Sequence, residues 1–88
     1  MFRLWCKILN ENNSIINETT VTDDSDLYRT KKVMNSLAKA CEELDLANPV
    51  WLESNIQEFR SHAKTRFRQD NFVENVEFNV FEIEVVDE

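Results

Sequence analysis

The chain contains no glycine among its 88 residues. Glycine is the residue that adopts positive φ most readily, and phosphate-binding loops and dinucleotide fingerprints require it where the backbone approaches the ligand. Nucleotide-binding loops of either usual kind are therefore excluded. Turns must be built from Asn, Asp and Ser, which tolerate the left-handed conformation best after glycine. Clusters of these residues at 10–13 and 23–26 are the predicted turns.

Length and composition predict one small domain that spans residues 1–88. Hydrophobic residues make up 42% of the chain and charged residues 31%, which is typical of a globular domain with one modest core. No apolar run approaches the roughly 20 residues of a membrane-spanning helix, and the start of the chain lacks a signal-peptide pattern. Two cysteines are too few for a disulfide framework. We therefore expect a cytoplasmic protein without membrane contact.

Two strands are predicted at the start of the chain. Apolar and polar residues alternate over 2–9, which places Phe2, Leu4 and Cys6 on one face of a strand. The segment 14–22 is rich in β-branched residues and follows the turn cluster, so it predicts the second strand of a hairpin.

Two helices and a last strand are predicted in the rest of the chain. Apolar residues recur every three or four positions over 27–44, which indicates a helix capped by Ser25 or Asp26. A second helix is expected over 55–64, after an extended segment whose Trp51 would plug the space between helices and sheet. The predicted last strand, 76–88, changes its apolar phase, which indicates a bulge near 79 or a late start.

The expected architecture is a two-layer ββααβ fold, with a three-stranded sheet and both helices packed on one face. The first strand is the most apolar and is expected at the centre. Glu82 and Glu84 would lie on the same outward face as Lys7, and opposite charges on adjacent strands favour pairing of the last strand with the first. Following the chain through the helices predicts that this pair is parallel.

Alternation places Arg3, Trp5 and Lys7 on the sheet face that the helices leave open. Because Trp and Arg are enriched among interface anchors, these three residues are a candidate partner-binding face. The alternative is that strand neighbours or the C-terminal tail cover Trp5, since single exposed apolar residues are common.

A basic segment at 60–68 contrasts with the acidic chain. The formal net charge is −7, yet this segment carries +4 from Arg60, Lys64, Arg66 and Arg68, so the remainder carries −11. These residues are a candidate anion or nucleic-acid surface. They could equally offset a helix dipole and pair with acids of the chain, or contact an acidic protein. The structural role is the favoured interpretation.

The sequence offers little material for catalysis. His62 is the only histidine, and Cys6 and Cys41 lie on predicted apolar faces, where a thiol fills the core. Their spacing matches no zinc pattern, and the aspartates of 23–26 are better explained as a turn and helix cap than as a calcium loop. We therefore expect no enzyme, no metal site and no cofactor.

Three segments, "RTKKV" (29–33), "PVWLESNIQEF" (49–59) and "KTRFRQDNFVE" (64–74), resemble a family of small uncharacterised bacterial proteins. The likeness spans nearly the whole chain and implies a bacterial protein with the predicted strand-pair start. The family has no assigned activity, so the resemblance adds nothing about function.

The sequence favours a small protein–protein interaction module that contacts another protein, or itself, through the open sheet face. Anion or nucleic-acid binding through the basic segment is the alternative, weakened by the negative charge of the whole chain.

Overall fold

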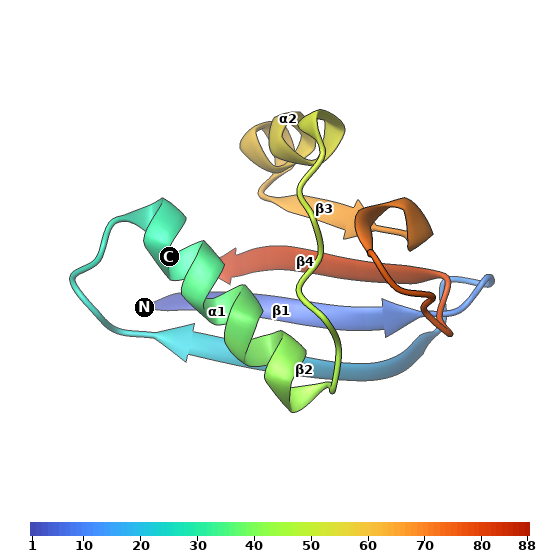
Figure 1. Ribbon diagram of the computed structural model, residues 1–88. Coiled ribbons are helices and arrows are strands. Elements are labelled where there is room, and N and C mark those ends of the chain that lie inside the picture. Colours follow the sequence, from blue (N-terminus) through green and yellow to red (C-terminus); the bar gives the residue numbers. More distant parts are fainter.

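Four antiparallel strands form one sheet in the order β2-β1-β4-β3 in the computed structural model, which describes residues 1–88 (Figure 1). The strands are β1 (Phe2–Leu9), β2 (Ile15–Asp23), β3 (Lys64–Phe67) and β4 (Val80–Asp87). The helices are α1 (Arg29–Glu43) and α2 (Glu53–His62), and a short 3₁₀ helix spans Gln69–Asn71. The α+β class and the two helices agree with the sequence prediction.

The prediction of three strands was wrong by one, because residues 64–67, directly where the predicted second helix ends, form an additional strand, β3. Its four residues alternate, with Thr65 and Phe67 completely buried and Lys64 exposed, but the run is too short to give a clear period of two. Ala63 ends α2 with φ at 57°, and the chain turns directly into β3. α2 therefore ends at His62, two residues before the predicted end of the second helix at residue 64.

The prediction of a parallel outer pair was also wrong. β1 and β4 are antiparallel, with Lys7 opposite Glu82 and Cys6 opposite Ile83. The missed strand explains the error, because β3 adds one pass across the sheet before β4 and reverses its direction. The central position of β1, its pairing with the last strand, and the late start of that strand at Val80 are confirmed.

One hydrophobic core lies between the sheet and the helices. It combines Leu4, Cys6, Phe81 and Ile83 from the sheet, all completely buried, with residues of both helices. In Figure 1, α1 crosses β1 and β2, and α2 lies beside β3. The helical members of the core are Val33, Leu37, Ala40 and Cys41 from α1 and Phe59 from α2.

Trp51 packs between helix and sheet, as predicted. Its ring meets Phe59 of α2 and Phe67 of β3 edge to face, with centroid separations of 5.5 Å and 5.2 Å. The predicted cap of the first helix is different: Tyr28 occupies the cap position of α1 and makes no side-chain cap hydrogen bond like that expected of Ser25 or Asp26.

A buried amide network that sequence reasoning missed joins α2, β3 and the 3₁₀ helix. The Asn55 amide nitrogen donates to the Thr65 hydroxyl at 2.9 Å and to the Arg66 carbonyl at 3.0 Å. Its oxygen accepts from the Leu52 N–H at 3.1 Å and from the Asn71 side chain at 2.7 Å. This side chain uses its full hydrogen-bonding capacity and fixes β3 against α2.

The turns form without glycine as expected at two positions. Asn13 and Asp45 adopt φ values of 62° and 57°, and both residue types tolerate this region. Ala63 is the third residue in the left-handed region, and nothing in its type predicts this. Neither helix has the length and apolar character needed to cross a membrane.

Candidate functional site

The sheet face opposite the helices carries the predicted residues Arg3, Trp5 and Lys7, all on the central strand. Trp5 is half-buried and its indole N–H donates to the Glu18 carboxylate at 2.8 Å. The Lys7 ammonium lies 3.7 Å from the centroid of the Trp5 ring. Contacts from two sides therefore hold the indole in one orientation, with part of its surface open to solvent.

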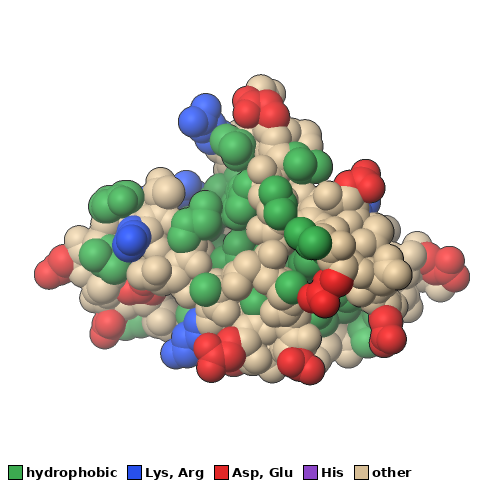
Figure 2. Space-filling model, in the orientation of Figure 1, with side chains coloured by type: hydrophobic (Ala, Val, Ile, Leu, Met, Phe, Trp, Pro, Cys, Tyr) green, Lys and Arg blue, Asp and Glu red, His purple; other side chains and the backbone are tan.

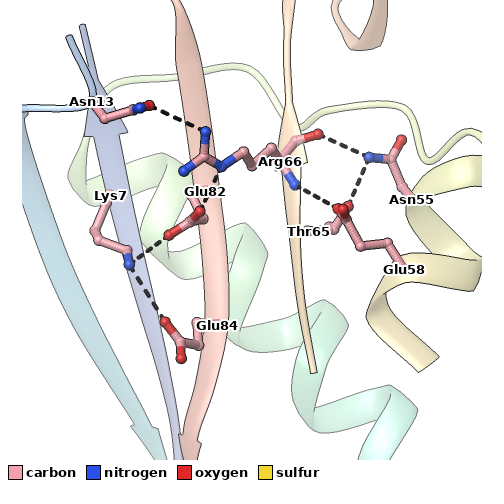
Figure 3. A network of polar contacts seen from close by, with 8 residues as sticks. All are labelled: Lys7, Asn13, Asn55, Glu58, Thr65, Arg66, Glu82 and Glu84. Carbon is pink, nitrogen blue, oxygen red and sulfur yellow. Dashed lines mark hydrogen bonds and ion pairs between the residues drawn. The ribbon is translucent and has the colours of Figure 1, made fainter. Parts of the chain in front are cut away.

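Beside Trp5, an ion-pair ladder crosses three strands (Figure 3). Glu82 on β4 pairs with Lys7 on β1 at 2.6 Å and with Arg66 on β3 at 2.7 Å. Lys7 also meets Glu84 at 3.4 Å, and Arg66 donates to the Asn13 side chain at 3.2 Å. The predicted opposition of Glu82 and Glu84 to basic residues of the first strand is confirmed.

The ladder changes the ionisation of Glu82. Burial of the carboxylate raises its pKa, but hydrogen bonds from Lys7 and Arg66 and their positive charges outweigh burial and hold the pKa below its ordinary value. Glu82 therefore stays ionised at neutral pH, and the positive charge of Lys7 is neutralised inside the face.

The four residues of the basic segment do not form one surface. Lys64 and Arg66 are two residues apart on β3 and both lie on the open face. Lys64 stands opposite Glu84, and Arg66 pairs with Glu82. Arg60 lies on α2 beside the groove between the helices, and Arg68 is exposed after β3. The segment therefore presents separated charges, and the one nearest the centre of the sheet is already paired.

An apolar groove of about 330 Å³ lies between α1 and α2. Figure 2 shows hydrophobic side chains gathered in the hollow between the two helices. The residues that line it are Arg29, Thr30, Val33, Met34, Trp51, Ile56, Phe59 and Arg60. Arg29 pairs with Glu88 at 2.7 Å, so the C-terminal residue already neutralises the positive charge of Arg29 at the groove. Sequence reasoning missed this groove because only tertiary packing brings the two helices together.

The predicted placement of both cysteines in the core is confirmed. Burial raises the pKa of Cys6 to about 12, with smaller contributions from Cys41 and Glu43, and burial raises the pKa of Cys41 to about 11. Both thiols are therefore protonated at neutral pH. His62 is the exposed last residue of α2, and no group of three or more His, Cys, Asp or Glu side chains is arranged to hold a metal ion.

Raised thiol pKa values predict that the protein loses stability in alkali. The thiols ionise near their ordinary value of 9.0 when unfolded and only near 11 to 12 when folded. Above pH 9 the unfolded chain therefore holds fewer protons, and the free energy of unfolding falls as pH rises. Denaturant titrations from pH 8 to 10.5 should give a steeper fall for the wild type than for Cys41→Ala. Equal slopes would contradict the buried, neutral thiols.

Comparisons of the chain with protein-family models, with curated proteins and with solved structures gave no match. The resemblance of residues 29–33, 49–59 and 64–74 to a bacterial family therefore stays a prediction, and function has to be inferred from the geometry of the surfaces.

Proposed function

We propose that the chain is a protein-binding module whose contact surface is the open sheet face around Arg3, Trp5 and Lys7. The observation that carries the proposal is the Trp5 ring, half-exposed at the centre of the sheet and held by Lys7 and Glu18. An aromatic side chain that is already ordered loses little conformational entropy on binding, which makes it an effective anchor. The partner is a second protein or another copy of this chain.

The charges around Trp5 suit a protein rather than a nucleic acid. Glu18, Glu82 and Glu84 interleave with the basic residues of the same face, so a phosphate backbone would meet carboxylates along its path. A protein surface can place charges of both signs opposite such a pattern. Because the chain as a whole carries −7, it supplies no compensating positive field.

Trp5→Ala tests the proposal by its effect on association. If Trp5 is the anchor, the substitution should weaken binding of the captured partner by about 30-fold, the usual effect of losing a central aromatic residue. Capture on the immobilised full chain, followed by titration, measures this loss. Tyr28→Ala is the matched control, because Tyr28 is 70% exposed at the start of α1 and should not matter. Equal loss in both variants, or in neither, would reject the face.

Anion or nucleic-acid binding through Arg60, Lys64, Arg66 and Arg68 remains the alternative proposal. It requires the separated positive charges to act together, and Arg66 already pairs with Glu82. Lys64→Glu with Arg68→Glu is the suitable test because both side chains are exposed, whereas Arg66→Glu would break the ladder. Retention on a nucleic-acid column that this double variant abolishes, and Trp5→Ala does not, would favour the alternative.

A further inference from the structure

The outer edge of β2 is the longest unpaired backbone edge of the sheet. β2 spans nine residues, lies at the end of the strand order and pairs only with β1 (Figure 1). The opposite edge, β3, has four residues and is flanked by α2. Natural proteins protect such edges with lysine, proline or a short length. β2 contains neither residue, and its central residues 17–21 carry one charge, that of Glu18.

The outward backbone groups of β2 can be assigned. The Glu18 N–H donates to the side-chain oxygen of Asn17 at 2.9 Å, so it does not take part in the ladder with β1. Hydrogen bonding alternates along an antiparallel strand, and the N–H and C=O groups of Thr20 and Thr22 therefore also point away from β1. A register shift opposite Ile8 and Leu9 interrupts this regular pattern before Asn17.

We infer that β2 pairs with β2 of a second copy in antiparallel orientation, so that two sheets join into one. The favoured register is centred on Thr19, the midpoint of the strand, because it pairs the largest number of residues. Glu18 then lies opposite Thr20 of the partner, and their outward N–H and C=O groups meet. Within the two paired strands like charges do not face each other in this register, whereas a register centred on Glu18 would oppose two carboxylates. The Thr19 hydroxyl donates to the Glu43 carboxylate of α1 at 2.6 Å, so the charge of Glu43 also lies near this centre.

Threonine and β-branched residues favour this partner. Thr19, Thr20 and Val21 have high strand propensity, and Thr19 faces Thr19 of the partner at the centre of this register. Each copy carries −7, so electrostatic repulsion opposes the contact and moderate salt should tighten it by screening. The Asn17 side chain must release the Glu18 N–H when the partner strand binds.

This inference rests on the proposed function only in that the chain acts by protein contact; it uses the edge of the sheet and leaves the Trp5 face free. Pairing at β2 would join the two open faces into one continuous surface with two Trp5 rings. A second copy is therefore the partner at the edge, and a different protein can still bind the face.

Substitutions of Thr20 test the edge, with the dimer dissociation constant of the full chain measured by analytical ultracentrifugation. Thr20→Lys should lower this constant by about 5-fold, because the dimer then contains two pairs in which the lysine of one copy faces Glu18 of the other. Thr20→Glu should raise the constant by a similar factor. Thr20→Pro should raise it by about 100-fold, since proline is tolerated where the N–H faces solvent but blocks strand addition.

Amide hydrogen exchange separates this contact from the Trp5 face. With rising protein concentration the amides of Glu18 and Thr20 should become protected, while those of Asn17 and Thr19 stay unchanged because they already face β1. A chain that remains monomeric at millimolar concentration and moderate salt, or a dimer insensitive to all three Thr20 variants, would overturn the inference. Dissociation by Trp5→Ala without protection of Thr20 would also overturn it, and would support the proposed face instead.

Discussion

Asn55→Ala is expected to lower the free energy of unfolding by about 4 kcal/mol, a large part of the total stability of a domain of this size. Asn55 is 5% exposed and makes four hydrogen bonds, two as donor and two as acceptor. The substitution leaves the buried Thr65 hydroxyl without a partner, removes one of the two hydrogen bonds that the Asn71 amide donates, and opens a cavity.

Chemical denaturation measures this loss, with Asn35→Ala as the matched control. Asn35 is exposed on α1 and its side chain makes no hydrogen bond within the chain, so its replacement should change stability by less than about 0.5 kcal/mol. Amide exchange should also accelerate in β3, because the Asn55 bonds to Thr65 and to the Arg66 carbonyl fix that strand. Similar stability for the two variants would contradict the role of the network.

Glu82→Gln is the second large effect, with an expected loss of about 3 kcal/mol. Glu82 is 6% exposed, and its carboxylate pairs with two cations, Lys7 at 2.6 Å and Arg66 at 2.7 Å. Lys7 is itself 7% exposed, so the amide leaves its ammonium with Glu84 alone as a charged partner at 3.4 Å. Removal of one member of a buried pair costs more than the pair contributes, because the other charge stays buried.

The pH dependence of stability gives this prediction a second readout. The pKa of Glu82 is lower in the folded chain than its ordinary value of 4.5, so the unfolded chain binds more protons in acid. Its contribution is complete above that ordinary value and is lost as pH falls through the depressed folded pKa. Glu82→Gln should flatten this acid limb, whereas Glu84→Gln, whose side chain is 33% exposed, should lose less than about 1 kcal/mol. An unchanged acid limb in Glu82→Gln would contradict the ladder.

Local patterns predicted the centre of the molecule well. Alternation in residues 2–9 placed Trp5 and Lys7 on one face and Leu4 and Cys6 on the other, because successive side chains of a strand point to opposite faces of the sheet. The charges of Glu82 and Glu84 then indicated which strand lies beside it. The face of the candidate site therefore followed from two patterns, each contained in a single segment.

Features that depend on distant segments could not be predicted in this way. β3 is defined by its pairing with β4 and by burial of Thr65 and Phe67, and its four residues are too few to show a period. The Asn55 network, the Arg66–Glu82 pair and the groove between α1 and α2 join residues from separate elements. Periodicity contains no information about such contacts. Because β3 was missed, the direction of β4 relative to β1 was also predicted wrongly.

Cross-linking from the open face tests the central claim most directly. A benzophenone amino acid in place of Glu84, which stands opposite Trp5 on that face and lies on β4 away from the β2 edge, would be activated in the cells that produce the protein. We predict covalent adducts to protein, either a second copy or another chain, that disappear when Trp5→Ala is added and are absent from the same probe at exposed Lys39 on α1. Adducts that persist in Trp5→Ala, or that form equally from Lys39, would contradict a protein-binding face around Trp5.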